Sequence, residues 1–278
     1  MTKKPVLPGV WWVEIPEVDL RILCGSPMDC VKHLMQQGHI RPVEKDGIPY
    51  ETGPNAILVS DLTIQGGRFW NLAEFPVLHM LYRQGMVLPN HPGNTGARPL
   101  LVGMKERVES VLDYIYRGNY GLASREEMRQ FGVPEADLED LWKLKIRFAG
   151  GGIKSPQELI DTVYVHQDPR EILPGVRIER LETNVYCIRY GNESTTVDMN
   201  FSPGTPWKAS YTLPQVRPLD GAFTVIHTGE GNGWDPDRPC MGSIVTHHGQ
   251  TYLVDAGGGC TKHWKPWGWI FLRLMVFL

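Results

Sequence analysis

The chain has 278 residues, of which 42% are hydrophobic and 21% are charged. These proportions are ordinary for one large folded domain or two smaller ones, and they exclude a largely disordered chain. The formal net charge is -3 and the pI is about 6.3. The chain therefore lacks the broad cationic surface that nucleic-acid binding requires.

The cysteines favour a reducing compartment. Cys24, Cys30, Cys187, Cys240 and Cys260 form an odd set without a Cys-x-x-Cys pair, which argues against a disulfide framework and a thiolate zinc knuckle. The N-terminal MTKKPVLPGVWW has no apolar run of signal-peptide length. The C-terminal WGWIFLRLMVFL has 12 residues, whereas a spanning helix needs roughly 20. We expect a cytoplasmic protein without a membrane anchor.

The first part of the chain predicts strands and two helices. VWWVEI, LRILC and AILVS are typical of strands. Ser26 as a cap, Pro27 in the first turn and Gly38 as a stop predict a helix between the second and third of these strands. Residues 71–86 predict another helix, which ends at Gly85.

Residues 104–160 are typical of helices. In MKERVESVLDYIYRG, apolar residues recur at three- and four-residue spacing, and the segments 124–127 and 155–158 match the capping box. Beyond residue 160 the period changes to that of strands, in VRIERL, NVYCIRY and STTVDMNF. Gly191 and Asn192 predict a hairpin turn between the last two.

A second unit is expected after residues 202–221, which are rich in proline and glycine and are the best linker candidate. AFTVIHTG, MGSIVTHH and QTYLVDAG predict three strands, with a long glycine-rich loop between the first two and Gly249 at a tight turn. We expect an N-terminal α+β region over residues 1–215, the start of another domain over residues 216–257, and an aberrant apolar tail over residues 258–278.

The string FTVIHTGEGNGWDPDRPCMGSIVTHHGQTYLVDAG resembles the opening of the metallo-β-lactamase superfamily of hydrolases, in particular its cyclic phosphodiesterase and tRNA-processing branch. The resemblance covers about residues 222–257. It implies the first strands of an αββα sandwich, so the expected fold class is α/β, with an N-terminal α+β region followed by an incomplete sandwich. Residues 10–230 contain the segments ETGPNAILVSD, NLAEFPVLHMLYRQGM and YIYRGNYGL. Through these segments the region also resembles a bacterial group in which such a region precedes the hydrolase domain and a cyclic-nucleotide-binding domain can follow.

The family's metal ligands form a His-x-His-x-Asp-His motif, whose imidazoles and carboxylate hold zinc-type ions and activate a bound water. His263 is the one histidine after Asp255, so the motif is missing. The resemblance implies zinc or another divalent metal for a complete relative and no cofactor for this chain. It places Asp255 and Gly257 beside the ligand loop, and Glu230, Asp235 and Asp237 on a loop at the rim of the active site. Solvated turn carboxylates are the alternative interpretation of those three residues.

Two interpretations of the tail remain open. Codons permitted for residues 259–278 can be read in another frame to give a helix and a strand start, which favours a frameshifted hydrolase gene. The alternative is a genuine tail that docks its tryptophans in a core. An incomplete sheet would also leave an edge and an apolar face without partners, so we expect aggregation or proteolysis after about residue 220.

Cys30 and His33 are three residues apart in the first predicted helix and could form a thiolate–imidazole pair, although a small core cysteine is the more ordinary interpretation.

Two functional hypotheses follow. The first is a truncated, inactive member of a metal-dependent hydrolase family that acts on a phosphodiester or similar ester. The second is a regulatory ligand-binding module that responds to a nucleotide without catalysis. The expected partner is a small-molecule substrate or nucleotide, with no nucleic acid and no membrane. The sequence does not set the oligomeric state.

Overall fold

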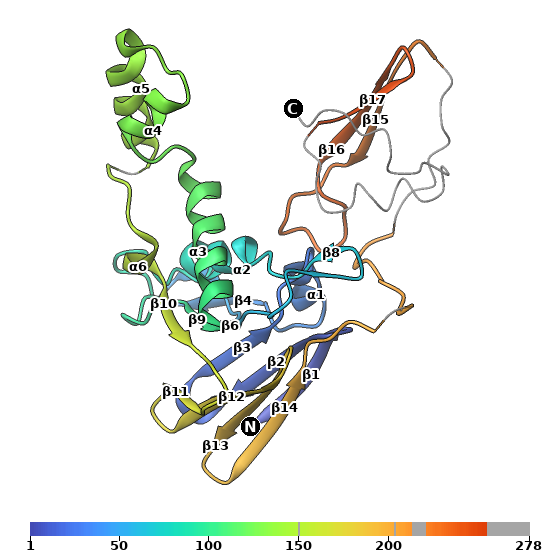
Figure 1. Ribbon diagram of the computed structural model, residues 1–278. Coiled ribbons are helices and arrows are strands. Elements are labelled where there is room, and N and C mark those ends of the chain that lie inside the picture. The colour runs from blue at the N-terminus through green and yellow to red at the C-terminus, as the bar shows by residue number, and fades with distance from the viewer. Residues whose placement is uncertain (150, 203, 213–220, 255–278) are drawn as a thin grey trace. The chain divides into compact units, whose positions relative to one another are not determined.

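The computed structural model describes residues 1–149, 151–202, 204–212 and 221–254 (Figure 1). The chain forms two compact units. The N-terminal unit comprises residues 1–27 and 41–203, and the C-terminal unit comprises residues 28–40 and 204–278. Helices and strands occur in both units, which confirms the α/β class. The C-terminal unit takes its helix from residues 28–40, so no single cut in the sequence separates the two units.

The centre of the N-terminal unit is a six-stranded mixed sheet in the order β1-β2-β3-β6-β9-β10. Its strands are β1 (Thr2–Leu7), β2 (Val10–Ile15), β3 (Leu20–Cys24), β6 (Ala56–Leu58), β9 (Leu100–Gly103) and β10 (Asp161–Tyr164). The first three pair antiparallel, whereas β3, β6, β9 and β10 run parallel. The predicted strands VWWVEI, LRILC and AILVS are confirmed as β2, β3 and β6, the last over its first three residues.

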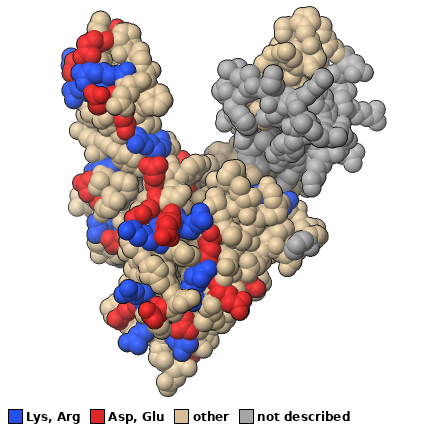
Figure 2. All heavy atoms as spheres, viewed as in Figure 1, with Lys and Arg blue, Asp and Glu red and all other residues tan. Residues whose placement is uncertain are grey.

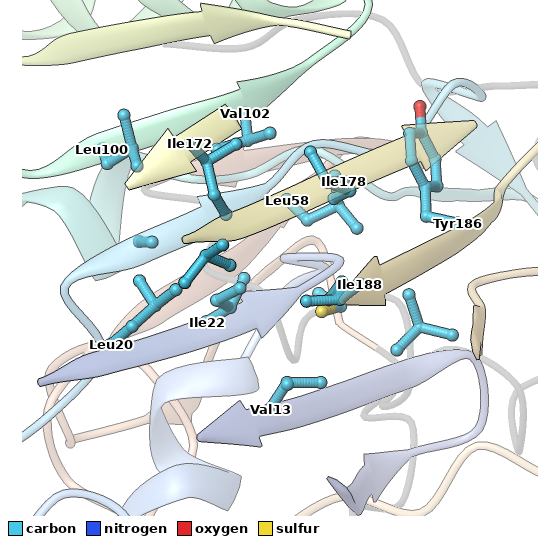
Figure 3. Close-up of a cluster of buried hydrophobic side chains, with 14 of the residues drawn as sticks. Val13, Leu20, Ile22, Leu58, Leu100, Val102, Ile172, Ile178, Tyr186 and Ile188 are labelled. Carbon is cyan, nitrogen blue, oxygen red and sulfur yellow. The ribbon is translucent and has the colours of Figure 1, made fainter. Parts of the chain in front are cut away.

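A four-stranded antiparallel sheet packs on one face of this sheet. It consists of β11 (Arg170–Leu173), β12 (Val176–Glu182), β13 (Val185–Tyr190) and β14 (Glu193–Asp198). The predicted turn at residues 191–192 joins the last two, where Tyr190 pairs with Glu193. Figure 3 shows the core between the sheets, in which Ile22 and Leu58 face Ile178 and Ile188. Each such buried aliphatic side chain stabilises the fold by roughly 1.5–3 kcal/mol.

Two short hairpins and a set of helices complete this unit. The hairpins pair β4 (Pro42–Lys45) with β5 (Ile48–Glu51), and β7 (Ile64–Gln65) with β8 (Arg68–Phe69). The helical elements are η1 (Pro16–Val18), α2 (Glu74–Leu78), η2 (His79–Arg83), α3 (Lys105–Tyr120), α4 (Arg125–Gln130), α5 (Glu135–Phe148) and α6 (Pro156–Leu159). As predicted, α3 buries its apolar stripe, namely Val108, Val111, Leu112 and Ile115.

The predicted cap serines are confirmed. Ser155 and Glu158 form the complete capping box at the start of α6. Ser124 accepts a hydrogen bond from the Glu127 amide at the start of α4. The Glu127 carboxylate reaches one residue further back than the box requires, because it accepts from the amide of Ala123.

Two helix boundaries were predicted wrongly. The first helix, α1 (Cys30–Gln36), begins after Asp29 rather than at Ser26. The Ser26 backbone instead forms a strand-like bridge to Asn71, in which the Ser26 amide donates to the Trp70 carbonyl and the Ser26 carbonyl accepts from the Leu72 amide.

The same bridge holds residues 71–72 extended, so the second helix is confined to α2 and the π-helical turn η2. Gly38 and Gly85 do follow the two helices, both with positive φ.

The described part of the C-terminal unit contains α1 and a three-stranded antiparallel sheet. The strands are β15 (Phe223–Gly229), β16 (Gly242–His247) and β17 (Gln250–Val254). They confirm the three strands predicted after the linker, and Gly249 has the positive φ expected at the turn between β16 and β17. The tail, and residues 203 and 213–220 of the linker, lie outside the described residues. Within the described residues, no helix has both the length and the apolar character that crossing a bilayer requires.

Candidate functional site

The predicted rim residues lie on the loop between β15 and β16. A backbone bridge between Gly231 and Cys240 closes this loop at its base. Arg238 brings two of the predicted carboxylates together, since its guanidinium lies 2.5 Å from Asp235 and 3.6 Å from Glu230. The hydrogen bond from Arg238, followed by one from the Asp237 amide, lowers the pKa of Asp235. Asp237 therefore contributes its backbone to this cluster.

Helix α1 anchors the same loop. Lys32 is fully buried, and its Nζ donates to the Arg238 carbonyl at 2.5 Å. The ammonium also lies 5.0 Å from the ring centre of Tyr211, whose hydroxyl donates to Asp29. Because the donor is charged and buried, this contact holds the loop more firmly than the surface pairs of Arg238 do.

A pocket of about 580 Å³ lies beside the loop and is lined in part by His227, Glu230 and Arg238. At its edge, the Ser243 hydroxyl is 3.1 Å from His227 Nδ1. A nucleophilic serine needs a base that a third group orients. Ser243 is the one hydrogen-bond partner of His227 among the described residues, and the two face each other in the strand register. The pair is an ordinary cross-strand contact.

Among the described residues, no side chains form a donor set for the metal that the family resemblance implies. No three histidine, cysteine, aspartate or glutamate side chains in the described part of the chain come together as metal ligands. Asp255 and Gly257, the two predicted residues beside the ligand loop, lie outside the described residues. We therefore derive no chemical step through zinc.

The Cys30 and His33 pair does not have the character of a nucleophile. Burial, with a smaller contribution from the Asp29 carboxylate, raises the pKa of the Cys30 thiol to about 12. A thiol with such a pKa stays protonated at neutral pH, whereas the nucleophile is the thiolate. Cys30 is a small core residue, in agreement with the more ordinary of the two interpretations.

A second candidate site lies in the N-terminal unit, in a crevice of about 370 Å³ between α3 and the β7–β8 hairpin. Helix α3 lines it with residues spaced by three, four and seven positions, which share one face of a helix. These are Arg107, Ser110, Val111 and Tyr114. The opposite wall consists of Thr63, Phe69, Asn71 and Leu72.

The crevice combines one cation, three hydroxyl groups and two aromatic rings. Arg107 donates to the Thr63 hydroxyl at 3.3 Å. Phe69 and Tyr114 are half exposed, at 55% and 47%. Burial, with the nearby Glu74 carboxylate, raises the pKa of Tyr114, so its hydroxyl is neutral at physiological pH. Asn71 is fixed in the opposite wall, because its amide oxygen accepts from the Ser60 amide and its amide nitrogen donates to the Ser60 carbonyl.

No family model and no curated protein matches this chain. The geometry of its sites therefore carries the functional argument.

A buried polar network supports the wall of the crevice to which Asn71 belongs. Asp61, which is 5% exposed, follows β6 and accepts hydrogen bonds from Arg180, Tyr186 and the Asn184 amide. Burial, together with Asp61, raises the pKa of Tyr186. The Asn184 side chain accepts in turn from the Ser60 hydroxyl at 2.8 Å and from the Asp61 amide at 2.7 Å. Every member is paired, so the network is structural and fixes the end of β6 beside Asn71.

Sequence reasoning missed both the crevice and this network. The helical half of the crevice has a signal, because Arg107, Ser110 and Tyr114 repeat with helical spacing. The other wall has none, since the β7–β8 hairpin is more than 30 residues away and only two residues long in each strand. The partners of Asp61 follow it by 119 to 125 residues, so no local pattern announces them.

Proposed function

We propose that the N-terminal unit is a ligand-binding module and that the crevice between α3 and the β7–β8 hairpin takes a nucleotide-type ligand. The combination of Arg107 with two exposed aromatic rings in one hollow supports the proposal. Guanidinium groups pair with phosphate oxygens in a planar, bidentate manner. Aromatic side chains stack on nucleobases, at roughly 1–3 kcal/mol for each base.

The hydroxyl groups supply the remaining recognition. Thr63 and Ser110 can exchange hydrogen bonds with a sugar, and the Tyr114 hydroxyl, which donates to Glu74, can accept from a base. A site of this volume, with a few convergent polar groups, fits a mononucleotide in preference to a longer chain. The position is also favourable, because the crevice lies next to the carboxyl end of β6, where α/β sheets commonly bind ligands.

The experiment is a thermal shift assay on the full chain with AMP, cyclic AMP and GMP. Adenosine and inorganic phosphate serve as partial ligands. A ligand at 100 times its Kd stabilises a protein by roughly 2.7 kcal/mol, or about 5–10 °C for a chain of this size. We expect a shift with a nucleotide and a smaller one with either fragment.

Two charge-removing variants decide whether the ligand occupies the crevice. Arg107→Gln removes the proposed phosphate contact. Lys105→Gln is the matched control, because it removes the same charge two residues earlier on α3, at a residue that does not line the crevice. We expect the shift to persist in the control and to disappear in Arg107→Gln. A shift that Arg107→Gln retains would place the ligand elsewhere, and no shift with any nucleotide would refute the proposal.

The second candidate function is that of the hydrolase family. We infer from the sequence resemblance that residues 222–257 correspond to the opening strands of the metallo-β-lactamase sandwich. The observation in its favour is the three-stranded antiparallel sheet, with a long loop between its first two strands and a glycine turn between the last two. The sequence contains no His-x-His-x-Asp-His motif, so we propose that this chain does not itself hydrolyse phosphodiesters.

A chromogenic phosphodiester, assayed with added zinc or manganese, tests this second proposal. We expect no rate above that of the metal salt alone. A steady metal-dependent rate that follows the protein through a final purification step would contradict it.

A further inference from the structure

Helices α4 and α5 form a hairpin at the far end of α3 from the sheet (Figure 1). Two bidentate ion pairs hold its helices together, namely Arg125 with Glu139 and Arg129 with Glu135. The apolar side of α5, by contrast, is exposed. Leu141, Leu144 and Phe148 of α5 are 41%, 49% and 84% exposed.

The exposed residues of α5 follow a heptad. Leu141 and Phe148 are seven residues apart, and Leu144 lies between them at a spacing of three and four. Such positions form the seam of a coiled coil. Asp140 precedes Leu141, and Arg147 precedes Phe148. These two charged residues therefore flank the seam on the same side of the helix.

The charges of α5 are divided between its two halves. Glu135, Asp137, Glu139 and Asp140 occupy the first half, and Lys143, Lys145 and Arg147 occupy the second. Figure 2 shows acidic and basic side chains gathered over this hairpin. A parallel copy of the helix would place like charges together, whereas an antiparallel copy would place each acidic half against a basic half. The charge pattern is therefore complementary to itself in one orientation.

We propose that two copies of this chain associate through antiparallel contact of their α5 helices. Leu141 of one copy packs at the level of Leu144 of the other, and the reverse contact follows by symmetry, as in an isologous interface. The flanking Asp140 of each copy then pairs with Arg147 of the other. Within one chain Asp140 contacts Lys143, but both side chains are more than 70% exposed, so little is lost when Asp140 changes partner.

A groove beside α5 receives the second helix. It has a volume of about 540 Å³ and is lined by the seam residues of α5 and by Tyr82, Tyr120 and Met128. A helix of 14 residues is about 21 Å long, so α5 alone buries far less than the roughly 800 Å² per partner of a standard interface. The groove walls add area without reaching that size. The dimer is accordingly reversible and depends on concentration.

Sedimentation velocity of the full chain over a range of concentrations tests the proposal. We expect a monomer–dimer equilibrium. Leu144→Glu places a charge in the seam and should weaken the dimer on the order of 100-fold. Leu181→Glu is the matched control, since Leu181 has a similar exposed fraction, 48%, but lies on β12.

A charge swap identifies the orientation. Arg147→Asp alone sets two carboxylates against each other at both symmetric positions and should weaken the dimer about tenfold. Adding Asp140→Arg restores complementarity, because the two exchanged side chains then face each other across the interface with opposite charges. The affinity of the double variant should return to within about threefold of the original.

Each contrary outcome refutes the proposal. A chain that is monomeric at all concentrations has no such interface. A dimer that Leu144→Glu or Arg147→Asp leaves intact would show that another surface associates. A double variant as weak as Arg147→Asp alone would refute the antiparallel pairing. Circular dichroism of each variant verifies that it is folded.

Discussion

Two aspartate–arginine pairs, one in each unit, have the same chemistry and opposite surroundings. The carboxylate of Asp61 is 4% exposed and accepts from three donors, of which Arg180 is one. Asp235 is 19% exposed, and its partner Arg238 is 53% exposed, against 20% for Arg180. A carboxylate that has left water needs all of its partners, whereas a pair in water is worth little and exchanges readily. The buried pair is therefore structural, and the more exposed pair contributes less to stability.

Removal of Asp61 should have the largest effect on stability. Asp61→Ala leaves the Arg180 charge, the Tyr186 hydroxyl and the Asn184 amide without their acceptor. Loss of one partner of a buried pair typically costs about 3–5 kcal/mol. Urea unfolding of the variant should show a decrease of that size in the free energy of unfolding. Asp61→Asn, which keeps the shape and one acceptor, should lose less, and equal losses in both variants would indicate that the negative charge, which both variants remove, accounts for the whole effect.

The contacts of Glu51 should make an intermediate contribution that depends on pH. Although burial opposes ionisation, hydrogen bonds from His79 and Arg83 lower the pKa of Glu51 from 4.5 to about 2. The ionised form thus favours the folded state. This stabilisation is complete above about pH 4.5 and is lost as the pH falls towards 2. Since the carboxylate is partly exposed, we expect about 1–2 kcal/mol at pH 6.

The measurement for Glu51 is a difference between two unfolding curves. Other carboxylates also titrate in this range, so the free energies of unfolding of the original chain and of Glu51→Gln are compared at each pH. The difference between them should shrink from pH 5 to pH 2. A difference that stays constant over this range would show that the carboxylate charge contributes nothing.

Sequence reasoning succeeded where one element decides its own structure. The apolar spacing of Val108, Val111, Leu112 and Ile115 was sufficient to predict α3, and alternation with glycine turns was sufficient for the strands β12 to β17. It failed at Ser26, where a cap signal was outweighed by a backbone bridge to a residue 45 positions later. The Asp61 network and the crevice depend on similarly distant partners, which local patterns do not encode.

The rim carboxylates should contribute least to stability. Glu230 and Asp235 share the half-exposed Arg238 within nine residues of sequence, and ion pairs at the surface contribute little. Asp235→Asn should therefore change the melting temperature by less than about 2 °C. Lys32→Met is the informative companion, because it removes the buried contact that anchors the same loop to α1. Limited proteolysis should cut the loop at residues 230–240 faster in Lys32→Met than in Asp235→Asn. The reverse order would mean that the surface pairs, not the buried lysine, hold this loop, and the contrast between buried and exposed pairs would then fail in the C-terminal unit.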